Sequence, residues 1–148
     1  GSGGGIFLED GLMTITNSNI NNSIYNDGIM TITNNVNVNN VTDGNSAIDN
    51  DNRMTISNNV NVYNNTSGGI YNEGDTMTVS NTQIYNNNTN YEGAGIYNDG
   101  NVMTVSNTQI YNNTSDEEGA GIYNDGNSFR LIGPFLLTFV FDIIIISN

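Results

Sequence analysis

The sequence predicts an all-β protein, a parallel β-helix (β-solenoid) of about five to six coils. A short segment recurs along the chain, apolar and polar residues alternate within each copy, and Asn or Gly interrupts the pattern every four to six residues. A recurrence of 17 to 26 residues is typical of solenoids. Short alternating stretches indicate strands, because an amphipathic helix needs apolar residues three and four positions apart over a longer stretch.

Two residue types mark the copies. The clearest recurrence is "GAGIYNDG", which occupies residues 93–100 and again 119–126. Each copy has an isoleucine and, a few residues later, a methionine, and the two series are Ile6, Ile24, Ile48, Ile70, Ile96, Ile122 and Met13, Met30, Met54, Met77, Met103.

Each copy contains three short alternating stretches, which in the fifth copy are residues 94–98, 103–107 and 108–112. Three strands joined by turns form one triangular coil, and coils stacked at about 4.8 Å place equal residues above one another. Ile, Met and Val are then expected to face inward. A single coil cannot be stable alone, because about four large apolar groups, worth roughly 1.5 to 3 kcal/mol each, cannot offset the entropy of ordering its residues.

Asn makes up 32 of the 148 residues and falls at the expected corners. Asn tolerates left-handed backbone angles, and stacked Asn amides can hydrogen-bond from coil to coil. We expect this structural role for two columns: Asn26, Asn72, Asn98, Asn124 and Asn64, Asn86, Asn112. Two middle copies carry one extra residue between Met and the inward Val38 or Val62, which predicts a bulge or a widened corner.

Charge and composition exclude several function classes. Fifteen acidic residues, two arginines and no lysine or histidine give a net charge of −13. This charge excludes nucleic acid as a partner, which would need clustered basic residues, and it would be repelled by anionic lipid. The chain has no cysteine, so disulfides and thiolate chemistry are excluded as well.

The motifs resemble a known repeat. Gly119-Ala120-Gly121-Ile122 and Ile110-Tyr111-Asn112-Asn113 are similar to the short "GGA-I" and "FxxN" motifs of polymorphic outer-membrane proteins and adhesin-like surface proteins, of the pectin-lyase-like group. The resemblance covers about residues 3–127. It implies a right-handed parallel β-helix, an extracellular or cell-surface location, and attachment to a host or neighbouring-cell surface through a glycan or a protein. The export signal would then lie outside this sequence.

An alternative within this group is a carbohydrate-active enzyme. Cleavage of uronic acids needs a basic proton acceptor and cations for the substrate carboxylate, but the chain offers only Arg53 and Arg130. Hydrolysis needs paired carboxylates. The available ones, Glu73, Asp99 and Asp125, recur once per coil at the same turn, where Asp-Gly is a favoured turn pair. We therefore expect no catalytic site and no cofactor.

The turn acids form a candidate metal site. Asp27, Glu73, Asp99 and Asp125 should stack into an acidic column whose like charges repel. Ca²⁺ suits oxygen-only ligands and would relieve this repulsion. No calcium-loop spacing is present, so solvated turns are the favoured interpretation.

Outward-facing residues supply candidate binding surfaces. Tyrosines align in two rows, Tyr71, Tyr97, Tyr123 (with Tyr25) and Tyr85, Tyr111 (with Tyr63). These rings could stack on sugars or a partner, or on each other. Thr78 and Thr104 belong to a Thr-x-Thr/Ser rank that resembles the ice-binding face of some antifreeze proteins, although Thr is also a common exposed strand residue. Ice or glycan binding is thus an alternative to a stalk or adhesin role.

The chain divides into a repeat array over residues 1–127 and a non-repeat apolar segment over 128–148. Residues 131–146 are nearly all apolar, but they include Pro134 and Asp142 and are too few for a spanning helix. Three interpretations stay open: a strand-forming cap on the last coil, which we favour, a membrane-associated end, or an altered reading frame.

Overall fold

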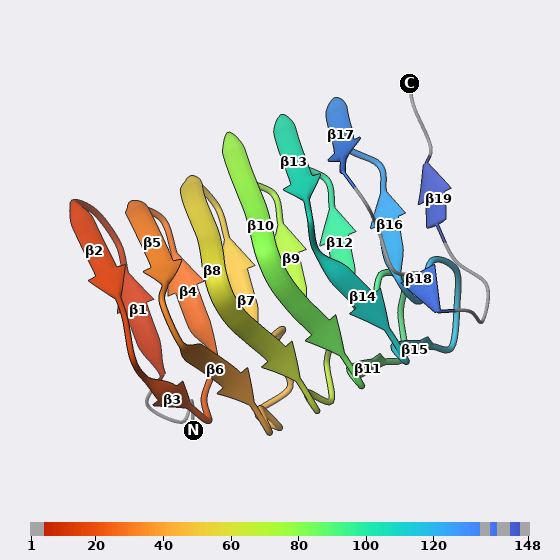
Figure 1. Cartoon of the computed structure of the whole chain (residues 1–148), viewed down its shortest axis with the longest axis horizontal. Coiled ribbons are helices and arrows are strands. Elements are labelled where there is room, and N and C mark those ends of the chain that lie inside the picture. Colours follow the sequence, from red (N-terminus) through yellow and green to blue (C-terminus); the bar gives the residue numbers. More distant parts are fainter. Residues whose placement is uncertain (1–4, 134–136, 139–142, 146–148) are drawn as a thin grey trace.

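The computed structural model describes residues 5–133, 137–138 and 143–145. Within these ranges all regular structure is β and no helix occurs. The strands pair in parallel and stack as a solenoid of about five turns (Figure 1). The predicted all-β solenoid is confirmed, and the arrangement is consistent with a right-handed parallel β-helix.

The first wall of the solenoid is built from the recurring isoleucine segments. Ile6 pairs with Ile24, and the same register continues through every later copy, so equal positions lie above one another. The strands, in stacking order, are β1 (Ile6–Leu8), β4 (Ile24–Asn26), β7 (Ile48–Asn50), β9 (Ile70–Asn72), β12 (Ile96–Asn98), β16 (Ile122–Asn124) and β19 (Ile143–Ile145).

The methionine segments form the second wall and the following Val or Ile segments form the third. The second wall contains β2 (Leu12–Ile15), β5 (Ile29–Thr33), the first parts of β8 (Arg53–Tyr63) and β10 (Thr76–Tyr85), β13 (Val102–Ser106) and β17 (Ser128–Ile132). The third contains β3 (Asn19–Ile20), β6 (Val36–Asn39), the second parts of β8 and β10, β14 (Gln109–Tyr111) and β18 (Leu137–Thr138). A short pair, β11 (Asn88–Thr89) and β15 (Thr114–Ser115), extends the later coils.

The corner between the second and third walls carries the predicted bulge. The register of β8 and β10 shifts between Ser80 and Thr82. On the β8 side, Asn58 and Asn59 both have left-handed backbone angles (φ 59° and 63°), whereas Asn81 alone turns the β10 corner (φ 51°). One coil therefore turns with two left-handed asparagines and the next with one. This difference accommodates the extra residue, and the strands stay paired on both sides of the corner.

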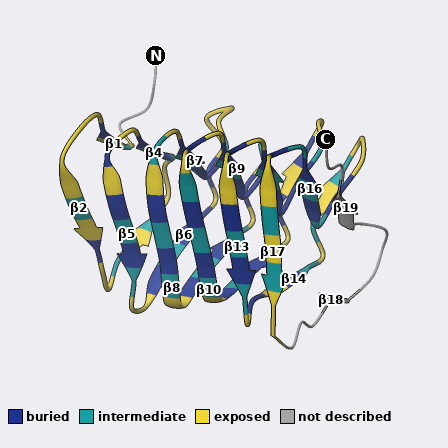
Figure 2. Cartoon of the chain, turned by 90° about the horizontal axis from the view of Figure 1, so that it is seen from above, coloured by how far each residue is buried: buried dark blue, intermediate teal, exposed yellow. Residues whose placement is uncertain are grey.

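The interior is filled by columns of equal apolar residues. Ile24, Met54 and Val62, one from each wall, are at most 1% exposed. Figure 2 shows buried and more exposed positions alternating along the second-wall strands. Phe129 and Leu131 of β17 continue the columns of Met103 and Val105 and pack against the core. The alternation in the sequence thus separates a dry interior from the outer faces.

The described parts of residues 128–148 pair with the last complete coil. β17 pairs in parallel with β13 on the second wall, β18 with β14 on the third wall, and β19 with β16 on the first wall. Among the described residues, no helix is long and apolar enough to cross a membrane.

The left-handed corner asparagines allow a first stability test. Asn81 is exposed at its corner and has φ 51°. Asn81→Ala is expected to lower the free energy of unfolding by about 1 kcal/mol, because a left-handed conformation penalises an ordinary Cβ. Asn81→Gly should change it by only a few tenths of a kcal/mol. Urea unfolding of both variants measures the difference, and equal stability of the two would contradict this account.

Candidate functional site

A ladder of buried asparagine side chains runs along the end of the first wall. In four successive pairs of asparagines, the Nδ2 of one donates to the Oδ1 of the asparagine in the next coil, at 2.6 to 2.7 Å. The ladder contains Asn26, Asn50, Asn72, Asn98 and Asn124, all at most 2% exposed. The predicted column is confirmed, with Asn50 added, and its members hold neighbouring coils in register inside the protein.

A second ladder lies at the end of the third wall, one residue beyond the predicted column. Asn65 Nδ2 donates to Asn87 Oδ1 at 2.8 Å, and Asn87 Nδ2 donates to Asn113 Oδ1 at 3.0 Å. The predicted residues Asn64, Asn86 and Asn112 instead have left-handed backbone angles, with φ between 53° and 57°. The corner thus divides the two expected tasks between adjacent residues: the first turns the chain and the second bonds the coils.

The glycine after each turn acid is explained by close packing. Gly74, Gly100 and Gly126 have no positive φ, unlike Gly11 or Gly44. A Cβ at Gly100 would lie 2.3 Å from Asn72 Nδ2 and 2.5 Å from the Gly74 carbonyl oxygen. The glycine at this turn therefore does not supply a left-handed backbone angle. The glycine leaves room for the ladder of the preceding coil.

The turn acids form the predicted column at the edge of the first wall. Each backbone N–H donates to a carbonyl of the preceding coil, as from Glu73 to Asn50 (3.0 Å), and likewise for Asp27, Asp99 and Asp125. Asp51 occupies the same position between Asp27 and Glu73, as alignment of "IDND" with "IYND" would have indicated. Within the described ranges, no group of three or more acidic residues is arranged to hold a metal ion, and the Ca²⁺ hypothesis stays an untested prediction.

Asp49 replaces a tyrosine in the outward row of the first wall. It pairs in register with Tyr25 on one side and Tyr71 on the other. It is half-buried, and in the described structure its Oδ1 is buried without a hydrogen-bond partner. Desolvation, followed by the charges of Asp51 and Glu73, raises the pKa of Asp49 to about 6. The ionised carboxylate is therefore destabilised in the folded protein.

This pKa shift predicts a pH-dependent stability. Below pH 4 Asp49 is protonated in both states. Between pH 4 and about 6 only the unfolded chain ionises, so stability falls as the pH rises. Asp49→Asn removes this slope and is expected to stabilise the protein by roughly 1 to 2 kcal/mol above pH 6, allowing for partial solvent screening. Urea unfolding at pH 4, 5, 6 and 8 measures it, and parallel curves for parent and variant would contradict it.

The tyrosine rows stack on themselves. Tyr71, Tyr97 and Tyr123 follow one another with ring centroids 4.9 and 5.2 Å apart. Tyr63, Tyr85 and Tyr111 stack at 4.9 Å on the third wall. Rings in the middle of a row have both faces covered by neighbours, so a sugar could reach only their edges. The rows thus stiffen the outer walls, and only the rings at the row ends keep a face that no other tyrosine covers.

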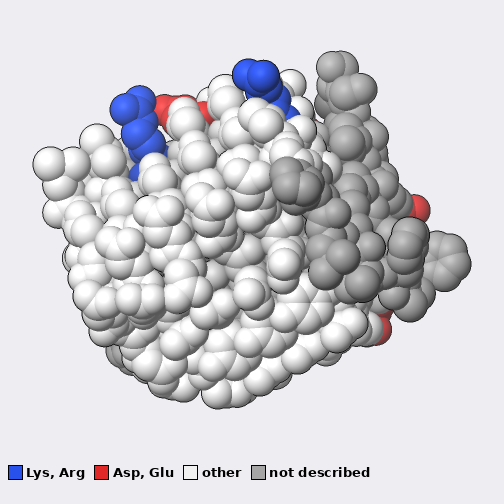
Figure 3. All heavy atoms as spheres, in the orientation of Figure 1, with Lys and Arg blue, Asp and Glu red and all other residues white. Residues whose placement is uncertain are grey.

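The threonine rank lies on the second wall. Thr14, Thr31, Thr55, Thr78 and Thr104 stand in register over five strands, and Arg130 takes the next position. The face seen in Figure 3 is almost free of charge, apart from the two arginines near one edge and a few acidic groups. Thr78 and Thr104 therefore belong to a regular neutral surface.

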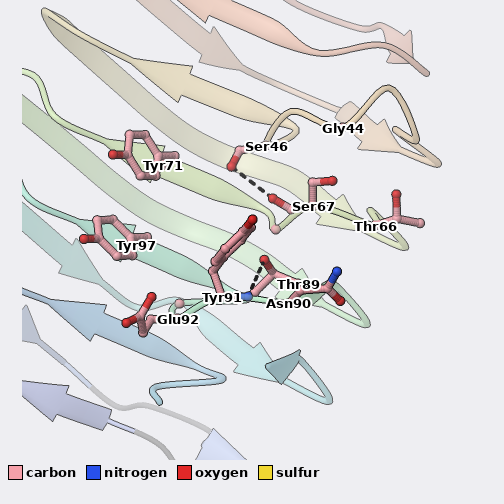
Figure 4. Close-up of a pocket in the computed structure, with 12 residues that line it drawn as sticks. Gly44, Ser46, Thr66, Ser67, Tyr71, Thr89, Asn90, Tyr91, Glu92 and Tyr97 are labelled. Atoms are coloured by element: carbon pink, nitrogen blue, oxygen red, sulfur yellow. Dashed lines mark hydrogen bonds between the residues drawn. The ribbon is translucent and has the colours of Figure 1, made fainter. Parts of the chain in front are cut away.

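A pocket lies where three successive loops meet the first wall. Its volume is about 350 Å³, and it is lined by Ser67, Tyr71, Tyr91, Glu92 and Tyr97, among others. Figure 4 shows the Tyr71 and Tyr97 rings on one side of Tyr91 and the Ser67 and Thr89 side chains on the other. The repeat pattern gave no signal for Tyr91 and Glu92, because they lie in "NTNYEGAG", a loop without a counterpart in the early copies.

The fold and its ladders define the class of this protein as a parallel, asparagine-rich β-solenoid. Comparisons with protein-family models, with curated proteins and with solved structures find no match. The function is therefore inferred from the outward faces of the walls and from the pocket.

Proposed function

We propose that the protein is a non-catalytic attachment module, adhesin-like or part of a surface stalk, that acts outside the cell or on its surface. The observation that carries this proposal is the repetition of equal outward side chains in register, such as Tyr71, Tyr97 and Tyr123. Many equal weak contacts along one surface give strong attachment through multivalency. The partner is a host or neighbouring-cell surface, through a glycan or a protein.

Two further features support this proposal. The buried asparagine ladder and the stacked tyrosines link each coil to its neighbours, as a load-carrying stalk requires. The turn carboxylates come one per coil along an edge, whereas hydrolysis needs two that face each other across a substrate. The resemblance to adhesin-like repeats adds the extracellular location.

Attachment can be measured with beads coated with residues 1–148 on cultured cells and on immobilised glycans. We expect coated beads to attach, and the double variant Tyr97→Ala, Tyr123→Ala to attach severalfold less because the row loses two rings. Val102→Ser, an exposed change on the second wall, is the control and should attach like the parent. If parent beads attach no better than albumin-coated beads, the attachment function is wrong.

The second candidate function is ice binding through the second wall. The observation that favours it is the in-register row of threonines over five coils. Thr78→Tyr with Thr104→Tyr would interrupt the flat rank and should abolish shaping of ice crystals. Absence of ice shaping by the parent protein, or shaping unaffected by the two changes, would end this candidate.

A further inference from the structure

The pocket beside Tyr91 differs from the repeated walls because it is formed by the loops that precede the first-wall strands β7, β9 and β12. Three successive loops contribute to it, over residues 40–47, 64–69 and 90–95. A volume of about 350 Å³ is in the range of small-ligand sites. A repeated wall offers many equal contacts, whereas this pocket is a single open recess lined by different residues.

Tyr91 supplies the free aromatic surface that the inner rings of the rows, Tyr85 and Tyr97, lack. It is 70% exposed, and the described residues include no ring stacked on it. Its backbone is nevertheless held: its N–H donates to Thr89 Oγ1 at 3.2 Å, and its carbonyl accepts a hydrogen bond from Ser115 Oγ. An aromatic ring on an anchored backbone can receive a ligand without a large ordering cost.

The groups around Tyr91 combine apolar ring surface with hydrogen-bonding groups. Tyr71 and Tyr97 present their edges, and Ser67 and Thr89 contribute hydroxyl groups on the opposite side (Figure 4). Burial, followed by the charge of Asp99, raises the pKa of Tyr97, so its phenol keeps its proton at neutral pH. A pyranose has the matching chemistry, with a face of C–H groups and an edge of hydroxyls.

The charge around the pocket selects among sugars. Glu92 lines the pocket, and Asp116, Glu117 and Glu118 lie in the loop of the next coil. A hydrogen bond with Glu92, followed by its charge and those of Asp116 and Glu118, raises the pKa of Glu117, which shows how closely these carboxyls gather. Such a rim repels a ligand carboxylate and attracts an ammonium group.

We propose that the pocket of Tyr71, Tyr91, Glu92 and Tyr97 binds one pyranose residue of a glycan, with amino sugars preferred over neutral sugars and acidic sugars rejected. This inference rests on the proposed attachment function and gives it a ligand class. Tyr91 stacks on the C–H face of the sugar, Glu92 accepts hydrogen bonds from its hydroxyl or ammonium group, and the hydroxyls of Ser67 and Thr89 bind the opposite edge.

Isothermal titration calorimetry of residues 1–148 with three tetrasaccharides tests the proposal. We expect glucosamine tetramer to bind more tightly than cellotetraose, and tetragalacturonate to show no binding. Raising the salt from 50 to 500 mM should weaken only the glucosamine oligomer, because its preference is electrostatic. Tyr91→Ala should weaken binding of both sugars at least tenfold, and Glu92→Gln should remove the preference for the amino sugar.

Tyr63→Ala is the matched control, because Tyr63 ends the tyrosine row on the third wall and lies outside the pocket. It should bind like the parent. No binding of any tetrasaccharide, tight binding of tetragalacturonate, or unchanged affinity in Tyr91→Ala would overturn the proposal. Bead attachment separates the two ideas: if Tyr91→Ala beads still attach like the parent, attachment stands and the pocket assignment falls.

Discussion

Replacing Asn72 with alanine is expected to lower the free energy of unfolding by about 2 to 5 kcal/mol. Asn72 lies in the middle of the buried ladder, where it accepts a hydrogen bond from Asn50 (2.7 Å) and donates one to Asn98 (2.6 Å). Alanine removes both bonds and leaves Asn98 Oδ1 without its donor and Asn50 Nδ2 without this acceptor. Each buried polar group deprived of its partner costs about 1 to 3 kcal/mol, and the vacated volume adds to the loss.

Urea unfolding followed by circular dichroism measures the loss. Asn101→Ala is the matched control, because Asn101 is exposed and bonds to Asp75 (3.0 Å) and Asn127 (2.8 Å) in a similar coil-to-coil manner. Water replaces the bonds of an exposed amide, so this change should cost less than about 1 kcal/mol. Equal losses at positions 72 and 101 would show that burial of the ladder contributes nothing.

Gly100→Ala is expected to destabilise the protein by about 3 kcal/mol or more, because the added methyl group overlaps atoms that cannot move independently. The Cβ would lie 2.3 Å from Asn72 Nδ2 and 2.5 Å from the carbonyl oxygen of Gly74. Relieving this overlap must separate two coils or displace the ladder amide. The effect is therefore larger than that of an ordinary alanine at a glycine position.

Gly44→Ala is the control that measures the cost of backbone strain without any steric overlap. Gly44 has φ 94°, and a Cβ there would meet nothing within 4 Å. The strain alone should cost about 1 to 2 kcal/mol. Thermal or urea unfolding of the two variants compares the effects, and a loss at position 100 no larger than at position 44 would contradict the close-packing account.

The repeat let the sequence predict most of the fold. Alternation around Met103 and Ile122 fixed which side chains face inward, and the extra residue before Val62 predicted the widened corner. These predictions succeed because a solenoid repeats one local structure. A pattern of inward and outward residues found in one copy can therefore be checked against the same positions in the other copies. The columns of turn acids and outward tyrosines followed from the same alignment.

The individual atomic contacts between neighbouring coils were harder to predict from the sequence. The sequence placed the second ladder at Asn86 and not at Asn87, because adjacent asparagines look equivalent until the backbone assigns one to the turn and the other to the interior. Asp49 and Asp51 were missed because their copy departs from the tyrosine pattern. The Asp-Gly pairs were predicted from turn preference alone, which does not reveal how closely the glycine approaches the amide of the preceding coil.

The sequence by itself thus determined the coil, its three walls, the inward and outward faces, and a net charge of −13. Only the tertiary structure decided which asparagines bond inside the protein, that the tyrosines cover one another, and that Tyr91 and Glu92 meet Tyr71 and Tyr97 in one pocket. The reason is physical: periodicity specifies where a side chain points, whereas a pocket arises where loops from different coils depart from that periodicity and approach each other.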